Sequence, residues 1–222
     1  MSDNNHTTKA SVFEDLFSDK EYLFQLYKVL HPEDEETTID LIQEVTLSNI
    51  FLRGRYNDLG MMVGNKLIIL VEAQSTWSVN IIPRCIMYLA DTWNRYGHDH
   101  QFYWYGEKKV ALPEAELYVV YTGDKQINKS EITLSEEFFD GKKTAIDATV
   151  KVITEKDGDN ILSQYITFCK VYDEQRKKYP DNGLFAITET IRICSEKDVL
   201  AAYLKDKEKE VKSIMLTLFS QE

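Results

Sequence analysis

The stretch YNDLGMMVGNKLIILVEAQ, residues 56–74, consists of two apolar runs separated by Gly64-Asn65. A Gly-Asn pair between two such runs is a turn signal, so the pattern predicts a β-hairpin. Asp58 precedes the first run, and Glu72 follows the second. The predicted hairpin therefore carries two carboxylates on neighbouring strands.

The register of the hairpin decides whether the two carboxylates can meet. Residues i and i+2 of a strand point to the same face, so Glu72 and Gln74 share a face. Asp58 lies opposite Glu72 only if the loop has three residues, Gly64–Lys66, or if one strand has a bulge. A two-residue Gly64-Asn65 turn would put the two acids on opposite faces. We therefore expect the three-residue loop or a bulge.

Two carboxylates and a backbone carbonyl are hard oxygen donors of the kind that Mg²⁺ prefers. We expect Asp58, Glu72 and the carbonyl of Ala73 to bind Mg²⁺, with Mn²⁺ as a substitute. Such a cation polarises a scissile phosphate and lowers the pKa of a bound water. Gln74 would orient the attacking water or a phosphate oxygen, because an amide is neither a base nor a cation. The pattern indicates a metal-dependent phosphodiesterase.

The rest of the chain alternates helical and strand-like segments in an order that indicates one α/β domain. We expect a disordered tail over residues 1–10 and a single domain over residues 11–222. Ser18 or Asp19 could cap a helix that stops near Pro32. The expected strands cover 44–51, 56–63, 67–73, 117–122 and 148–153. The expected helices cover 12–17, 20–30, 39–43 and 78–103, with a helical turn at 135–139. Most of 160–222 is also expected to be helical, with breaks at 180–183 and 195.

Composition limits the class of protein. The 222 residues are 43% apolar and contain no run long enough to cross a bilayer. The N-terminus lacks the basic-then-apolar pattern of a secretory signal, so we expect a cytoplasmic protein. The three cysteines are widely spaced, which argues against a disulfide framework or a structural zinc site.

A net charge of −11 opposes binding of nucleic acid by the surface as a whole. A local basic groove can nevertheless exist on an acidic protein. The candidate basic clusters are Arg53 with Arg55, Lys108-Lys109, Lys142-Lys143 and 176–178.

Several motifs occur together in this chain. Asn57-Asp58 is followed by Glu72-x-Gln74-Ser75-Thr76, and then by Asn80, Pro83, Arg84 and Tyr88. The segments VFEDLF at 12–17, VLHP at 29–32 and EITLSEEF at 131–138 belong to the same series. Over residues 12–222 the chain resembles the PD-(D/E)XK nuclease superfamily, and within it the recombination-promoting nuclease (Rpn, transposase-like) branch of bacteria.

The resemblance implies a restriction-endonuclease-like core, with a mixed sheet of about four strands flanked by helices, and a helical section from about residue 160. It also implies Mg²⁺-dependent DNA cleavage of mobile-element, recombination or defence type. By position, Asp58 and Glu72 would bind the metal, and Gln74 would replace the usual lysine, which removes a positive charge. Asp15 could supply a further acid. Arg84 and Tyr88, one helical turn apart, could contact phosphate or support the site. For Tyr88 a core role fits better than this. For Arg84 a buried salt bridge fits equally well.

Two other functions remain open: a non-catalytic interaction module that kept the fold, and an RNA nuclease. The segment His98-Asp99-His100 has metal-like residue types, but we expect it at the surface. The aromatic run Phe102–Tyr105 could stack on bases, although a core or interface role is better supported. The segment Val199–Phe219 forms an amphipathic pattern that either packs within the chain or forms a homodimer.

Overall fold

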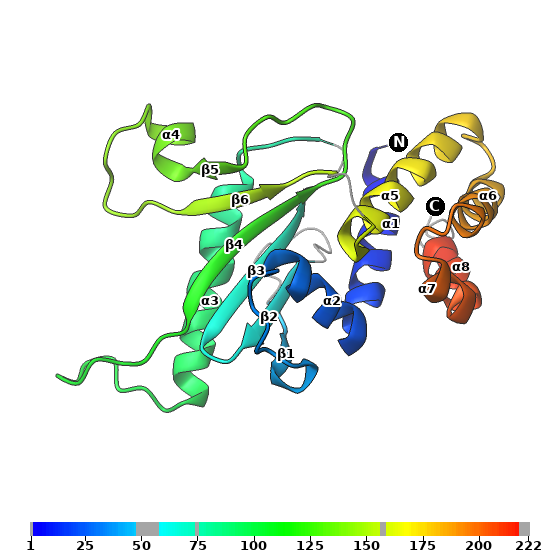
Figure 1. Ribbon diagram of the computed structural model, residues 1–222. Coiled ribbons are helices and arrows are strands. Elements are labelled where there is room, and N and C mark those ends of the chain that lie inside the picture. The colour runs from blue at the N-terminus through cyan, green and yellow to red at the C-terminus, as the bar shows by residue number, and fades with distance from the viewer. Residues whose placement is uncertain (1, 48–57, 74–75, 156–158, 218–222) are drawn as a thin grey trace.

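The computed structural model describes residues 2–47, 58–73, 76–155 and 159–217, and for residues 2–8, 10, 72, 73 and 217 it describes the backbone alone. These residues form an α/β fold with a mixed, open, six-stranded sheet and helices on both faces (Figure 1). In spatial order the strands are β1 (Ile42–Val45), β2 (Leu59–Val63), β3 (Lys66–Ala73), β4 (Glu114–Tyr121), β6 (Thr149–Ile153) and β5 (Glu131–Thr133). The helices are α1 (Ser2–Ser18), α2 (Lys20–Leu30), a 3-10 turn (Ile39–Leu41), α3 (Ile81–Asp99), α4 (Leu134–Phe139), α5 (Ile161–Lys178), α6 (Gly183–Glu196), α7 (Ala201–Asp206) and α8 (Glu208–Thr217).

The α/β class and the mixed sheet are confirmed, but the expected size of about four strands is wrong. The sheet continues past β4 through β6, which pairs with β4 in parallel, and ends with β5, which pairs with β6 in antiparallel. The strand β5 has only three residues, too few for a recognisable alternation of apolar and polar side chains.

The strands β2 and β3 form the predicted hairpin, but in a different register from the expected one. Two residues, Gly64-Asn65, close the hairpin, and the expected three-residue loop or bulge is wrong. Gly64 has a φ of +59°, which suits the first central position of a type II′ turn, because glycine adopts positive φ without strain. Continuing this register by one residue places Asp58 across from Val71 rather than Glu72.

Parallel pairing brings three strand ends to one edge of the sheet. β4 pairs in parallel with β3 and with β6. The β3 residues 67–71 are completely buried, as expected for a strand with helices on both faces. The strands β3, β4 and β6 end at Ala73, Tyr121 and Ile153, and we call this end of the sheet the carboxyl edge. Because β2 runs antiparallel to β3, Asp58 at the start of β2 also lies at the carboxyl edge.

Side chains of the central strands alternate between two apolar clusters, one on each face. Ile68 and Leu70 pack with α1, α2 and α5 on what we call the α5 face. Leu67 and Ile69 pack with α3 on the opposite face, the α3 face. Figure 1 shows α3 behind the sheet and α2 in front of it, with α1 and α5 beside α2. This alternation fixes which helices any strand residue can reach.

The N-terminal region consists of two helices. The first, α1, begins at Ser2 and so includes most of the segment for which we expected a disordered tail. Asp19 separates it from α2 and caps α2 as predicted, accepting a hydrogen bond from the Glu21 backbone N–H at 2.9 Å. The helix α2 ends at Leu30, before Pro32, as expected.

The C-terminal section is helical from Ile161, and its predicted break at 180–183 is confirmed between α5 and α6. The predicted final amphipathic helix is divided at Lys207 into α7 and α8. Val211 and Met215 are completely buried on the α5 face, so this segment packs within the chain, and the homodimer stays a prediction. Among the helices of the described residues, none is long and apolar enough to cross a membrane.

Candidate active site

Asp58 and Arg84 form a buried ion pair at the carboxyl edge. Asp58 directly precedes β2, and Arg84 lies in the first turn of α3. Arg84 Nη2 donates a hydrogen bond to Asp58 Oδ2 at 2.7 Å. The Asp58 side chain is only 2% exposed, and that of Arg84 is 21% exposed. Of the two roles expected for Arg84, the structure gives it the buried salt bridge.

Tyr88 and Cys85 complete this cluster from the next turn of α3. Both are buried, and for Tyr88 this agrees with the expected core role. Burial raises the pKa of Tyr88, and the charge of Asp58 and a hydrogen bond to it raise that pKa further. Burial, with Asp58 as the smaller cause, raises the pKa of Cys85 to about 12. Burial opposes the charge on Arg84, but Asp58 outweighs it and the pKa of Arg84 is raised. At neutral pH the guanidinium is therefore charged, while the phenol and the thiol are neutral.

The other expected site residues lie at or beyond the end of β3. Glu72 and Ala73 pair through their backbones with β4, opposite Val120 and Tyr121. The side chain of Glu72 lies outside the described residues, as does the whole of Gln74. The structure thus brings the backbone of Glu72 and Ala73 to the same edge as Asp58.

The two faces of the sheet affect how the acids can meet. Strand alternation puts the backbone position of Glu72 in the row of Ile68 and Leu70, on the α5 face. Asp58 instead contacts Arg84 of α3, on the α3 face. Asp58 precedes the β2 ladder, so strand pairing does not fix its direction. A cation shared by Asp58 and Glu72 would have to bind around the end of the sheet rather than across the ladder.

Asp15, the expected accessory acid, is placed against the C-terminal helices. Its Oδ2 accepts a hydrogen bond from Tyr203 Oη at 2.7 Å and lies 3.4 Å from Lys207 Nζ. Burial and the hydrogen bond to Asp15 both raise the pKa of Tyr203. These contacts give Asp15 a structural role, because they join α1 to α7.

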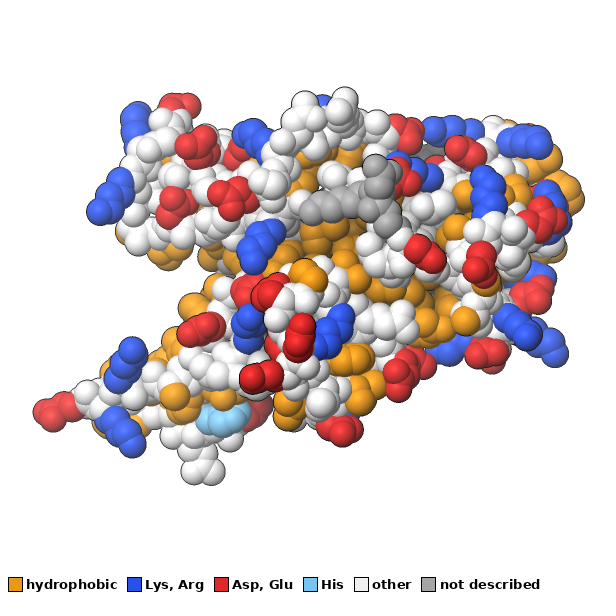
Figure 2. Space-filling view, in the orientation of Figure 1, with side chains coloured by type: hydrophobic (Ala, Val, Ile, Leu, Met, Phe, Trp, Pro, Cys, Tyr) orange, Lys and Arg blue, Asp and Glu red, His pale blue; other side chains and the backbone are white. Residues whose placement is uncertain are grey.

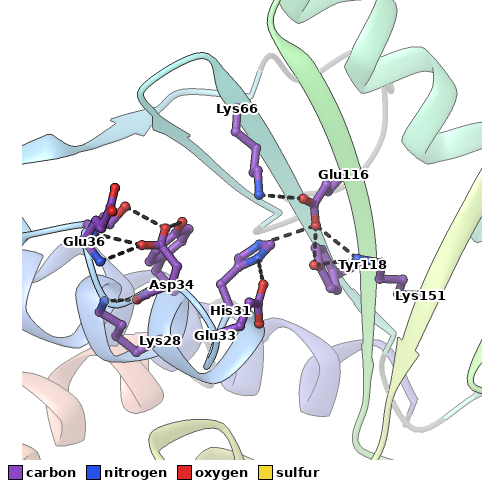
Figure 3. Close-up of polar contacts among 11 residues, drawn as sticks. Lys28, His31, Glu33, Asp34, Glu36, Lys66, Glu116, Tyr118 and Lys151 are labelled. Atoms are coloured by element: carbon purple, nitrogen blue, oxygen red, sulfur yellow. Dashed lines mark hydrogen bonds and ion pairs between the residues drawn. The ribbon is translucent and has the colours of Figure 1, made fainter.

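A second polar cluster, centred on Glu116 of β4, lies on the α5 face (Figure 3). The Glu116 carboxylate accepts hydrogen bonds from Tyr118 Oη at 2.5 Å and from Lys151 Nζ at 3.1 Å, and lies 3.0 Å from Lys66 Nζ. Lys66 begins β3 and Lys151 lies on β6, so this one carboxylate connects three adjacent strands.

His31, which directly follows α2, joins this cluster. Its Nδ1 lies 3.2 Å from Glu33 Oε1, and its Nε2 lies 3.4 Å from Glu116 Oε2 without forming a hydrogen bond. The His31 side chain is 5% exposed. Figure 3 shows the ring between the two carboxylates, where it links the loop after α2 to the sheet.

The pKa of Glu116 gives a testable dependence of stability on pH. Burial alone would raise this pKa, but hydrogen bonds from Tyr118, Lys66 and Lys151 lower it to about 2, against 4.5 ordinarily. A lowered pKa means that the stabilisation is present above pH 4.5 and is lost as the pH falls towards 2.

We therefore expect Glu116→Gln to lower the free energy of unfolding by about 1–3 kcal/mol at pH 7, and by much less near pH 2, where glutamine resembles the protonated acid. Urea unfolding at both pH values measures this difference. Glu114→Gln, which changes an exposed carboxylate on the same strand, is the control and should have little effect at either pH. An equal loss for Glu116→Gln at both pH values would contradict the assignment.

The donor types of the expected metal site fit Mg²⁺, since carboxylate and carbonyl oxygens are its usual protein ligands. Among the side chains that the structure describes, no group of three His, Cys, Asp or Glu residues could hold a metal ion. That set includes Asp58 but not Glu72. A cation at this place would also have to share Asp58 with Arg84, because the two side chains are already paired.

No family model, curated protein or solved structure matches this chain.

Proposed function

We propose that this protein is a Mg²⁺-dependent DNA endonuclease that hydrolyses phosphodiester bonds, of mobile-element, recombination or defence type. The observation that supports this most is the position of Asp58, Glu72 and Ala73 at one end of the sheet. Open α/β sheets bind ligands at the carboxyl ends of their parallel strands. The residues with the chemistry for a metal site therefore lie at the end of the sheet where such sites form.

The order of elements is a second support. The helices α1 and α2 precede three antiparallel strands, and α3 then crosses over to β4, which pairs in parallel with β3. This is the arrangement of helices and a mixed sheet that the resemblance to the PD-(D/E)XK superfamily implies. We propose on this basis that the core is restriction-endonuclease-like.

In the proposed mechanism Asp58, Glu72 and the carbonyl of Ala73 hold the cation. A bound Mg²⁺ would polarise the scissile phosphate and lower the pKa of a water molecule. Gln74 would orient that water through its amide, without taking its proton. Arg84 acts as a positioning residue, because its hydrogen bond fixes the Asp58 carboxylate.

Nicking of supercoiled plasmid DNA tests this function. We expect open-circular product with Mg²⁺ or Mn²⁺ and none with EDTA. Added RNA should compete poorly, because the proposed substrate is DNA. Efficient competition by RNA, followed by RNA degradation, would indicate an RNA nuclease instead.

The Asp58–Arg84 pair favours a second candidate, a non-catalytic interaction module with the same fold. The Asp58 carboxylate is almost completely buried and already neutralised by a guanidinium, which leaves it a poor metal ligand. A protein of this kind would show neither metal-dependent nicking nor any effect of changing Glu72 on its interactions.

A further inference from the structure

The chain forms a protruding arm after α3, at the far end of that helix from Arg84. We use the word arm for residues 101–109. About 15 residues of helix, or about 20 Å at 1.5 Å per residue, separate Arg84 from the arm. Figure 1 shows this part of the chain extending away from the sheet between α3 and β4.

Aromatic packing on the last turns of α3 fixes the base of the arm. The Phe102 backbone N–H donates to the Gly97 carbonyl at 2.7 Å, and the Phe102 ring packs edge-on against Trp104 at 5.8 Å between centroids. A Cβ at Gly97 would lie 2.3 Å from Trp104 Cζ2, so only glycine permits this contact. The arm is therefore a defined structure, held at its base by Phe102 and by Trp104, whose side chain stays 47% exposed.

Tyr103 and Tyr105 are the most exposed aromatic residues of the arm. Tyr103 is 72% exposed and Tyr105 91% exposed, and their ring centroids are 6.3 Å apart. A hydrogen bond from the Gly106 N–H to the Tyr103 carbonyl, at 3.0 Å, closes the turn that presents them. A core role, one of the roles expected for this aromatic run, is wrong for these two tyrosines. Large rings presented in this way indicate a binding surface.

Two lysines follow the tyrosines and indicate what the surface binds. Lys108 and Lys109 are exposed, and neither forms a salt bridge with a described residue. Figure 2 shows Lys or Arg side chains along this protrusion and an acidic side chain at its tip. Tyrosine is common in protein interfaces, but lysine is depleted there. Aromatic rings beside phosphate-neutralising lysines are instead typical of surfaces that bind single-stranded nucleic acid.

We propose that the arm binds unpaired single-stranded DNA, with Tyr103 and Tyr105 stacking on bases and Lys108 and Lys109 contacting phosphates. This inference rests on the proposed endonuclease function and adds to it a preference for substrates with an unpaired segment. The arm would hold that segment about 20 Å from the cleavage site, measured along α3.

Fluorescence anisotropy with a labelled oligothymidylate of about 20 nucleotides tests the inference. The full chain is used in EDTA, so that binding is measured without cleavage. We expect Tyr103→Ala with Tyr105→Ala to weaken binding by at least about tenfold. The double change to phenylalanine, which keeps both rings, should retain binding. Replacing Lys108 and Lys109 by alanine should reduce the slope of log K against log salt by about 1.4.

The matched control removes two exposed aromatic rings elsewhere, with Phe138→Ala and Phe139→Ala on α4, and should bind like the wild type.

Three results would overturn the inference: no binding by the wild type, wild-type binding by the double tyrosine variant, or equal binding of a duplex of the same length. The inference would also be overturned if the double tyrosine variant lost a dimer but bound DNA as the wild type does. That result would make the arm a protein interface. Tighter binding of oligouridylate would indicate RNA. Because nicking is measured separately with Mg²⁺, failure of the endonuclease proposal would show as binding without cleavage.

Discussion

Glu72→Gln is expected to abolish Mg²⁺-dependent nicking of plasmid DNA, with a loss of about 10³-fold or more in rate. The substitution keeps the shape of the side chain but removes the charge that would bind the cation. Residue 72 pairs through its backbone with β4, and this pairing does not depend on the side chain. The variant should therefore unfold at the same urea concentration as the wild type. The measurement is the rate of conversion of supercoiled to open-circular DNA.

Glu114→Gln is the matched control for the nicking assay, because Glu114 lies at the opposite end of the neighbouring strand β4. It should nick at the wild-type rate. Wild-type activity in the Glu72→Gln variant would exclude Glu72 as a metal ligand. Absence of activity in all three proteins would support the interaction module.

Arg84→Met should lower the free energy of unfolding by about 3–5 kcal/mol, because it leaves a buried carboxylate without its cation. The Asp58 side chain is 2% exposed and cannot regain its hydration within the fold. Replacing the pair together, with Asp58→Leu and Arg84→Met, should recover most of the loss. Urea unfolding at pH 7 measures both variants, the single and the double, against the wild type.

An exposed arginine gives the control for this series. Arg192 pairs with Glu189 and Glu196 on α6, and its side chain is 50% exposed. Arg192→Met should have little effect on the free energy of unfolding, as is usual for surface ion pairs. If Arg84→Met is no more destabilising than Arg192→Met, the Asp58–Arg84 pair does not stabilise the fold as the structure indicates.

Local patterns in the sequence were sufficient to predict the main elements of the fold. The apolar runs on either side of Gly64-Asn65 predicted the β2–β3 hairpin, and the spacing of apolar residues in 78–103 predicted α3. The register of the hairpin was wrong because we required the two acids to face each other, whereas the turn is set by the backbone of Gly64. The geometry of the turn determined which residues pair, and the expected metal site did not.

Less of the candidate site could be predicted. Asp58 and Arg84 were both candidates, but their direct pairing depends on how α3 packs against the sheet. The cluster around Glu116 was missed, although Glu116 and Tyr118 have the i, i+2 spacing of residues on one strand face. His31 contacts Glu116 across 85 positions of the sequence, and no local pattern predicts a contact over that separation.

The central claim is that Asp58 and Glu72 together bind one divalent cation at the carboxyl edge of the sheet. Crystals soaked in Mn²⁺ test it most directly, since anomalous scattering locates the metal. We expect one peak between the two carboxylates, with metal–oxygen distances of about 2 Å, and with Arg84 displaced from one Asp58 oxygen or sharing the carboxylate. Crystals at saturating Mn²⁺ that show no peak there, with Asp58 still bound to Arg84, would contradict the claim.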